Sequence, residues 1–168
     1  MVRTTTVFLT ALYYSKDHMK TQEEFLTDFH ALKNTDGILI GIDYGNKRIG
    51  LAVTDTKRRM AFAFKTIEKL VELDEIVADR KPIAFVIGMP YEPDGGEGFM
   101  VHQVRLFSAR IMEKYALPVY FWDERDTSSE ATYALYQAGA KGKKHKQHLD
   151  AHAAAIILQR ALEALDNR

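Results

Sequence analysis

The chain has 168 residues, no cysteine and a formal net charge of zero. This length predicts one domain with a buried core and room for a short appendage. The lack of cysteine excludes disulfides and thiolate metal sites, and is compatible with the reducing cytoplasm where we expect the protein. The zero net charge excludes a global attraction to nucleic acid, and no apolar run approaches the ~20 residues of a membrane-spanning helix.

The first 36 residues are predicted to form an N-terminal extension with one short helix. Thr21 and Glu24 have the spacing of a capping box, which predicts a helix over about 21–33. Its apolar residues would lie on one side and either cover an apolar patch of the domain or pair two copies of the chain. The sequence leaves both open. Residues 1–18 are expected to be dispensable.

Residues 37–168 are predicted to form the main domain, an α/β unit. Apolar runs bounded by glycine and proline predict five strands, and apolar residues at helical spacing predict the helices between them. The first three strands should be antiparallel and the others parallel, in one mixed sheet with helices on both faces. The predicted strands are 38–43, 49–54, 59–65, 83–87 and 118–122, and the predicted helices are 66–80, 99–115, about 127–139 and 149–165.

Three acidic residues lie at the ends of three different predicted elements. Asp43 ends the first strand, Glu124 follows the fifth, and Asp150 begins the last helix. In open α/β sheets, sites form at the carboxyl ends of strands, so Asp43 and Glu124 could face one crevice. Oxygen ligands of this kind suit Mg²⁺ or Mn²⁺. A single acid at such a place is usually a cap, but three together favour a metal site.

Asp123 competes with Glu124 for the second position. Alternation along a strand places the two side chains on opposite faces, and the sequence alone does not say which faces inward.

Four segments resemble the YqgF/RuvX family, from about Gly37 to Leu162: G-I-D-Y-G-N-K-R-I-G-L-A-V-T-D, I-G-M-P-Y-E-P-D-G, D-E-R-D-T-S-S-E-A and H-L-D-A-H-A-A-A-I-I-L. That family contains bacterial Holliday junction resolvase-like proteins that are also implicated in maturing the 5′ end of precursor 16S rRNA. The resemblance implies an RNase H-like fold and an acidic triad of Asp43, Glu124 and Asp150 that holds divalent metal. It favours Glu124 over Asp123.

One position departs from related resolvases. Some of them carry a further acid one helical turn after the last one, and here that place is Ala153, beside His152. A second metal ion would therefore be held less well, which leaves one-metal chemistry or a weak nuclease open.

Basic residues near these acids are predicted to bind a nucleic-acid backbone through sequence-independent contacts. The segment 141–147 is basic and is predicted to be flexible. The alternative to phosphate binding is a solvated turn at Lys47 and a merely mobile charged loop at 141–147. Trp122 is a candidate for base stacking. His145, His148 and His152 resemble a zinc cluster, and His148 and His152 have the i, i+4 spacing of a zinc pair on a helix. Zinc binding is disfavoured because the chain has no cysteine and no third ligand near that pair is evident. The predicted nucleic-acid-binding residues are Lys47, Arg48, Arg125, Lys143, Lys144 and Lys146.

The leading hypothesis is a Mg²⁺- or Mn²⁺-dependent endonuclease acting on structured nucleic acid, most simply the 5′ end of precursor 16S rRNA, with ribosome association. Branched DNA is the alternative substrate. An actin-like ATPase is disfavoured because such enzymes close two domains around a nucleotide, and a non-catalytic nucleic-acid-binding module stays open. The protein could be a monomer or a homodimer, since cutting a four-way junction symmetrically requires two copies.

Overall fold

The computed structural model describes residues 19–31, 36–125 and 143–166, except for the side chains of 31 and 143–148. The predicted helix near 127–139 and the first 18 residues lie outside the described residues. The described elements are β1 (Met19–Lys20), α2 (Gln22–Ala31), β2 (Leu39–Tyr44), β3 (Ile49–Thr54), β4 (Ala61–Ile67), α3 (Glu72–Arg80), β5 (Ala84–Met89), α4 (Phe99–Tyr115), β6 (Val119–Asp123) and α6 (Lys143–Asp166).

One six-stranded sheet has the order β1-β6-β5-β2-β3-β4. The strands β2, β3 and β4 form an antiparallel meander, while β2, β5, β6 and β1 run parallel. This confirms the predicted mixed α/β sheet, in which three antiparallel strands are followed by parallel ones. The two-residue strand β1 was not predicted, because two residues are too few to show an alternating pattern.

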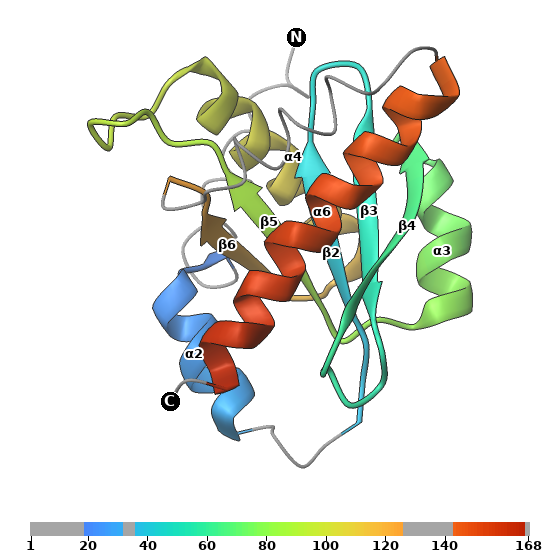
Figure 1. Ribbon diagram of the computed structural model, residues 1–168, viewed down its shortest axis with the longest axis vertical. Coiled ribbons are helices and arrows are strands. Elements are labelled where there is room, and N and C mark those ends of the chain that lie inside the picture. The colour runs from blue at the N-terminus through green and yellow to red at the C-terminus, as the bar shows by residue number, and fades with distance from the viewer. Residues whose placement is uncertain (1–18, 32–35, 126–142, 167–168) are drawn as a thin grey trace, which may run out of the picture.

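The helices cover both faces of the sheet, and each face has its own apolar core. Figure 1 shows α6 crossing the sheet diagonally over β2, β3 and β4, with α2 beside β6. The core on this face contains Phe25, Leu158 and Trp122. Side chains of α3 and α4, among them Leu73 and Val104, pack with Ile42 and Ile87 in the core on the opposite face. Residues that alternate along β2 and β5 therefore point to α6 or away from it.

Two helices begin at other places than the sequence predicted. The helix predicted from residue 66 is α3, which begins at Glu72 because β4 continues to Ile67 and a turn follows. The Glu72 carboxylate accepts hydrogen bonds at 2.9 Å from the amides of Glu68 and Lys69 and closes that turn. The last helix begins at Lys143 rather than 149. The prediction of a flexible basic segment up to residue 147 is therefore wrong for 143–147, which are helical.

The helix α2 covers an apolar patch of the sheet, which was the first of the two roles left open. The predicted capping box is confirmed, since the Glu24 amide donates to Thr21 Oγ1 at 3.2 Å and the Thr21 amide donates to Glu24 Oε2 at 2.7 Å. Phe25 and Phe29 are buried against β6.

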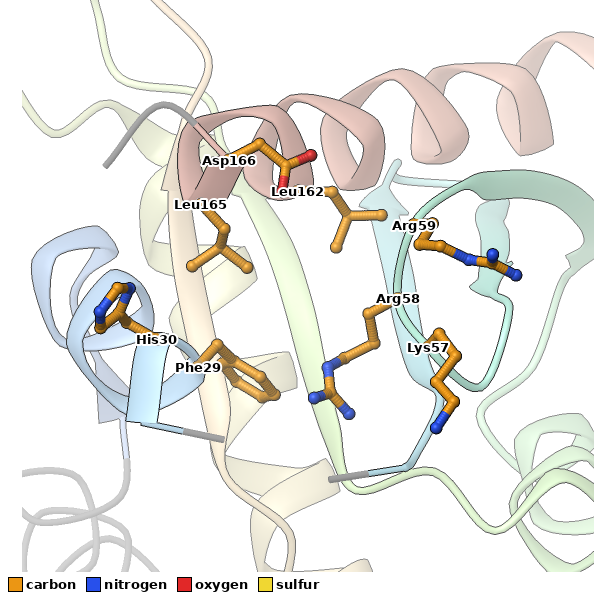
Figure 2. Close-up of a pocket in the computed structure, with 8 residues that line it drawn as sticks. All are labelled: Phe29, His30, Lys57, Arg58, Arg59, Leu162, Leu165 and Asp166. Carbon is orange, nitrogen blue, oxygen red and sulfur yellow. The ribbon is translucent and has the colours of Figure 1, made fainter. Parts of the chain in front are cut away.

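A cavity of about 330 Å³ lies between the ends of α2 and α6 and the turn from β3 to β4. Figure 2 shows Leu162 and Leu165 of α6 pointing towards Phe29 and Arg58. Since an α-helix rises 1.5 Å per residue, Asp166 at this cavity is about 24 Å along α6 from Asp150. The cavity is thus remote from the predicted acids.

None of the helices that the structure describes is long and apolar enough to span a membrane.

Candidate active site

Asp43 and Asp150 are brought together by a glycine. Asp43 on β2 is paired with Gly50 on β3. A Cβ atom added to Gly50 would lie only 1.9 Å from the main-chain oxygen of Asp150, so the backbone of α6 rests directly on β3 at this point. A glycine inside a strand commonly marks such a close approach. The absence of a side chain at position 50 therefore places the first described turns of α6 beside Asp43.

A second glycine makes room for the Glu124 carboxylate. A Cβ atom added to Gly88 on β5 would lie 1.5 Å from Glu124 Oε1 and 2.7 Å from Ile157 Cδ1 of α6. The Glu124 side chain therefore lies over β5 on the face covered by α6. Gly88 is one position beyond the pair Ile42–Ile87, in the row of Asp43. The Glu124 side chain thus reaches over β5, and it lies on the same face of the sheet as Asp43 of β2, the strand on the other side of β5.

Asp123 takes a different position. Its carboxylate accepts hydrogen bonds from Arg125, at 2.6 Å from Nη2 and 3.1 Å from Nε. The hydrogen bond from Arg125 lowers the pKa of Asp123. Asp123 is therefore the anchor of Arg125, and of the two neighbouring acids it is Glu124 that lies beside Asp43.

Asp43 and Glu124 are partly buried, and the protein atoms around their carboxyl groups limit hydration of the charged forms. Burial, with the nearby charge of Asp150, raises the pKa of Asp43 to about 6. Burial, with the charges of Asp43 and Asp123, raises the pKa of Glu124 to about 8. Such shifts mean that the protein provides too little positive charge to stabilise both ionised carboxylates. A bound cation would supply that charge and lower both pKa values.

Arg48 interacts with Asp150. Its Nε donates to Asp150 Oδ2 at 2.6 Å, across the end of the β2–β3 hairpin. The turn is closed by the Gly45 amide, which donates to the Arg48 carbonyl at 3.0 Å. Lys47, next to it, is exposed. The hairpin thus presents one cation to solvent and directs the other to a predicted metal ligand.

Arg125 is held from two sides. Besides its bonds to Asp123, its guanidinium lies 5.3 Å from the ring centroid of Tyr91. A Cβ atom on Gly95 would lie 2.9 Å from Arg125 Nη1, so the loop after β5 passes close to this side chain. Sequence reasoning missed Tyr91, which carries no local signal beyond its place in a family-like segment.

Other predicted site residues have different outcomes. Trp122 is 6% exposed, with its ring edge-on to Phe25 at 6.1 Å, so the prediction of a base-stacking role is wrong. Lys143, Lys144 and Lys146 lie at the start of α6, just before Asp150, but their side chains are outside the described residues, as are those of His145 and His148.

The donor set fits a hard divalent cation. Asp43 and Glu124 offer only oxygen atoms, and their raised pKa values mean that the ionised carboxylates are disfavoured until a cation stabilises them. As the side chains stand, no three His, Cys, Asp or Glu groups converge on one point within the described part of the chain. The Asp150 carboxylate is turned to Arg48. The arrangement therefore offers two ready ligands and a third that is held in an ion pair.

The comparisons with known proteins identify the family of the chain. A family model described as "RuvX: Holliday junction resolvase" matches residues 37–164. A protein of Rhodobacter capsulatus named "Putative pre-16S rRNA nuclease" is 37% identical over 146 residues, covering 83% of this chain and 92% of that protein. A protein of the same name from Nitratidesulfovibrio vulgaris is 41% identical over 135 residues, covering 77% and 95%.

Among solved structures, Thermus thermophilus RuvC is similar with a TM-score of 0.48 at 16% identity, covering 77% of this chain and 96% of that one. The same protein in complex with a Holliday junction substrate gives a TM-score of 0.49 at 14% identity, covering 76% and 94%. The family match spans most of the chain, and the relatives match it over nearly their whole length. The chain therefore belongs to the RuvX family of nucleases.

Proposed function

We propose that the protein is a divalent-metal-dependent endonuclease that processes the 5′ end of precursor 16S rRNA. The observation that carries this proposal is the pair of water-shielded carboxyl groups of Asp43 and Glu124 on one face of the sheet, with Asp150 of α6 resting on the glycine paired with Asp43. The names of the relatives support the substrate.

Asp43 and Glu124 would hold Mg²⁺ or Mn²⁺, with Asp150 as the third ligand once Arg48 releases it. A bound divalent ion supplies Lewis-acid stabilisation of the phosphoryl oxygens and lowers the pKa of a bound water. The protein keeps the carboxylates rigid: Asp43 lies in a paired strand, and Glu124 is confined between Gly88 and Ile157. Such fixed ligands need little reorganisation during the reaction.

The basic residues supply affinity and orientation. Arg48, when it leaves Asp150, and Lys47 are positioned at the hairpin to meet a phosphate. Arg125 keeps a fixed orientation through Asp123 and Tyr91, and a planar guanidinium suits bidentate contact with phosphate. Lys143, Lys144 and Lys146 add sequence-independent attraction to the backbone. These contacts recognise phosphate geometry rather than bases.

The second candidate is cleavage of four-way DNA junctions. The description of the family model favours it, and none of the proposed phosphate contacts discriminates DNA from RNA. It would require two active sites and hence a homodimer.

A cleavage assay decides between these functions. Wild type, Asp43→Asn and the control Glu113→Gln, an exposed acid on α4, would be incubated with a labelled precursor 16S rRNA 5′ fragment and a labelled four-way junction. We expect Mn²⁺- or Mg²⁺-dependent cutting of the rRNA fragment that is lost only in Asp43→Asn. Cutting of the junction alone would establish the second candidate. Equal binding by all three proteins without cutting would contradict both.

A further inference from the structure

Residues 19–31 contact β6, the strand that leads to Glu124, through a paired strand at its outer edge and a helix packed against it. The strand β1 extends the sheet beyond β6, with Met19 paired to Val119 and Lys20 to Tyr120. Without β1, β6 would be an edge strand with unpaired backbone groups. We call residues 19–31 the β6 clamp.

The apolar part of the clamp covers β6 on the same face of the sheet as α6, beside the strands over which α6 packs. The helix α6 packs mainly across β2, β3 and β4, whereas α2 packs on β6. Phe25 is completely buried, with its ring 5.3 Å from that of Tyr120 and 6.1 Å from that of Trp122. Trp122 is two residues before Glu124, so the packing of α2 reaches almost to the predicted metal ligand.

Polar side chains of the clamp form hydrogen bonds with both ends of β6. At its beginning, Asp28 Oδ2 accepts from the Tyr120 hydroxyl at 2.7 Å and from Lys20 Nζ at 2.5 Å. At its end, Gln22 Oε1 accepts from the Asp123 amide at 3.3 Å. The next amide, that of Glu124, donates to the Met89 carbonyl at 3.4 Å, so both amides at the end of β6 make hydrogen bonds that are longer than usual, and neither is strong alone. The contact from Gln22 therefore supports the main chain where β6 ends and Glu124 begins.

We propose that the β6 clamp is part of the catalytic architecture and that Gln22 is a positioning residue for Glu124. The assignment rests on the proposed function for the role of Glu124. It is independent of the family match, because the clamp precedes residues 37–164. Gln22 would act through the Asp123 amide, which fixes the direction in which the chain leaves β6. A carboxylate displaced by about 1 Å can cost an enzyme on the order of 100-fold in rate.

The test uses Gln22→Met in the full chain, which keeps the side-chain length and removes the acceptor oxygen. Glu23→Met, at an exposed position of the same helical turn, is the matched control. Exchange of the Asp123 amide with solvent is followed by NMR, and emission and quenching of Trp122 are followed by fluorescence. Trp122 is the chain's single tryptophan, so it reports on β6 alone.

We expect Asp123 amide exchange to become about tenfold faster in Gln22→Met, corresponding to one lost hydrogen bond, with an unchanged melting temperature. The kcat for the rRNA fragment should fall severalfold while KM stays the same, and Glu23→Met should match wild type. Unchanged amide exchange in Gln22→Met would contradict the claim that Gln22 orders the end of β6. Faster exchange with full kcat would overturn the positioning role. If wild type cuts nothing, the proposed function fails, while exchange and Trp122 emission still decide whether the clamp orders the end of β6.

Discussion

Gly50 lies directly beneath Asp150, so that a methyl group at position 50 would overlap the Asp150 carbonyl at 1.9 Å. Since the obstacle is helix backbone and not a flexible side chain, Gly50→Ala must move α6 away from the sheet. Overpacking of this kind typically costs about 1–3 kcal/mol of stability. We expect a loss of that size in urea unfolding, together with a large loss of cleavage.

Gly96→Ala is the control for this change, because the nearest atom there, at 2.9 Å, is the tip of the Asp94 side chain in an exposed loop. Wild-type stability and cleavage in Gly50→Ala would show that α6 does not rest on β3 as described.

Gly88→Ala should separate activity from stability. Its Cβ would overlap the Glu124 carboxylate at 1.5 Å, and that side chain can rotate away, although Ile157 Cδ1 at 2.7 Å must also yield slightly. We expect cleavage to fall roughly 100-fold, as for a misplaced catalytic group, while urea unfolding changes less than in Gly50→Ala. An alanine variant with full cleavage would mean that the position of Glu124 over Gly88 is irrelevant to the reaction.

The raised pKa values predict an unusual dependence of stability on pH without metal ions. A carboxyl group whose pKa is higher in the folded protein than in the unfolded chain binds more protons when folded, so stability falls as pH rises between the two values. For Glu124 this interval runs from the ordinary pKa of 4.5 to about 8, and for Asp43 from 3.8 to about 6.

Glu124→Gln should therefore become progressively more stable than wild type as the pH is raised from 5 to 8 in EDTA. Urea midpoints at several pH values measure this difference. Added Mg²⁺ should reduce the difference, because the ion compensates the charge that the glutamine lacks. A difference that does not change with pH would contradict the described shielding of Glu124 from water.

Arg48 competes with a metal ion for Asp150, because its Nε is 2.6 Å from Asp150 Oδ2. Arg48→Gln should therefore bind Mn²⁺ more tightly than wild type and yet cleave more slowly, since the substrate phosphate loses a cation. Titration calorimetry and cleavage rates measured on the same preparation test the two parts. Weaker Mn²⁺ binding in Arg48→Gln would show that the arginine orients Asp150 for the metal instead of withholding it.

Much of this arrangement follows from sequence patterns, and the remainder depends on contacts between distant segments. The helix over 99–115 was predicted with its observed bounds, since its apolar residues repeat at helical spacing between Gly98 and Pro118. The start of α6 was missed because the basic residues from Lys143 onwards show no apolar periodicity. Helices in proteins depend on packing as well as on propensity, so such a turn can form where the sequence suggests a loop.

The site shows the same division. The three acids were identified from their places at element ends, but the choice of Glu124 over Asp123 required the family resemblance, and only the structure shows which side chain lies beside Asp43. Gly50 and Gly88 are strand glycines, a signal of close approach that sequence reasoning could have used. Gln22 and Tyr91 act across more than thirty residues of intervening chain and carry no local pattern.

Binding of Mn²⁺ to wild type, Glu124→Gln and Asp123→Asn tests the central claim most directly, because it asks whether the shielded pair of carboxyl groups holds a divalent ion. Electron paramagnetic resonance of free Mn²⁺ during titration gives the affinity of each protein. The account predicts that Glu124→Gln loses at least tenfold in affinity, whereas Asp123→Asn, which alters the anchor of Arg125, binds as wild type does. Equal affinity in wild type and Glu124→Gln, or a loss confined to Asp123→Asn, would contradict it.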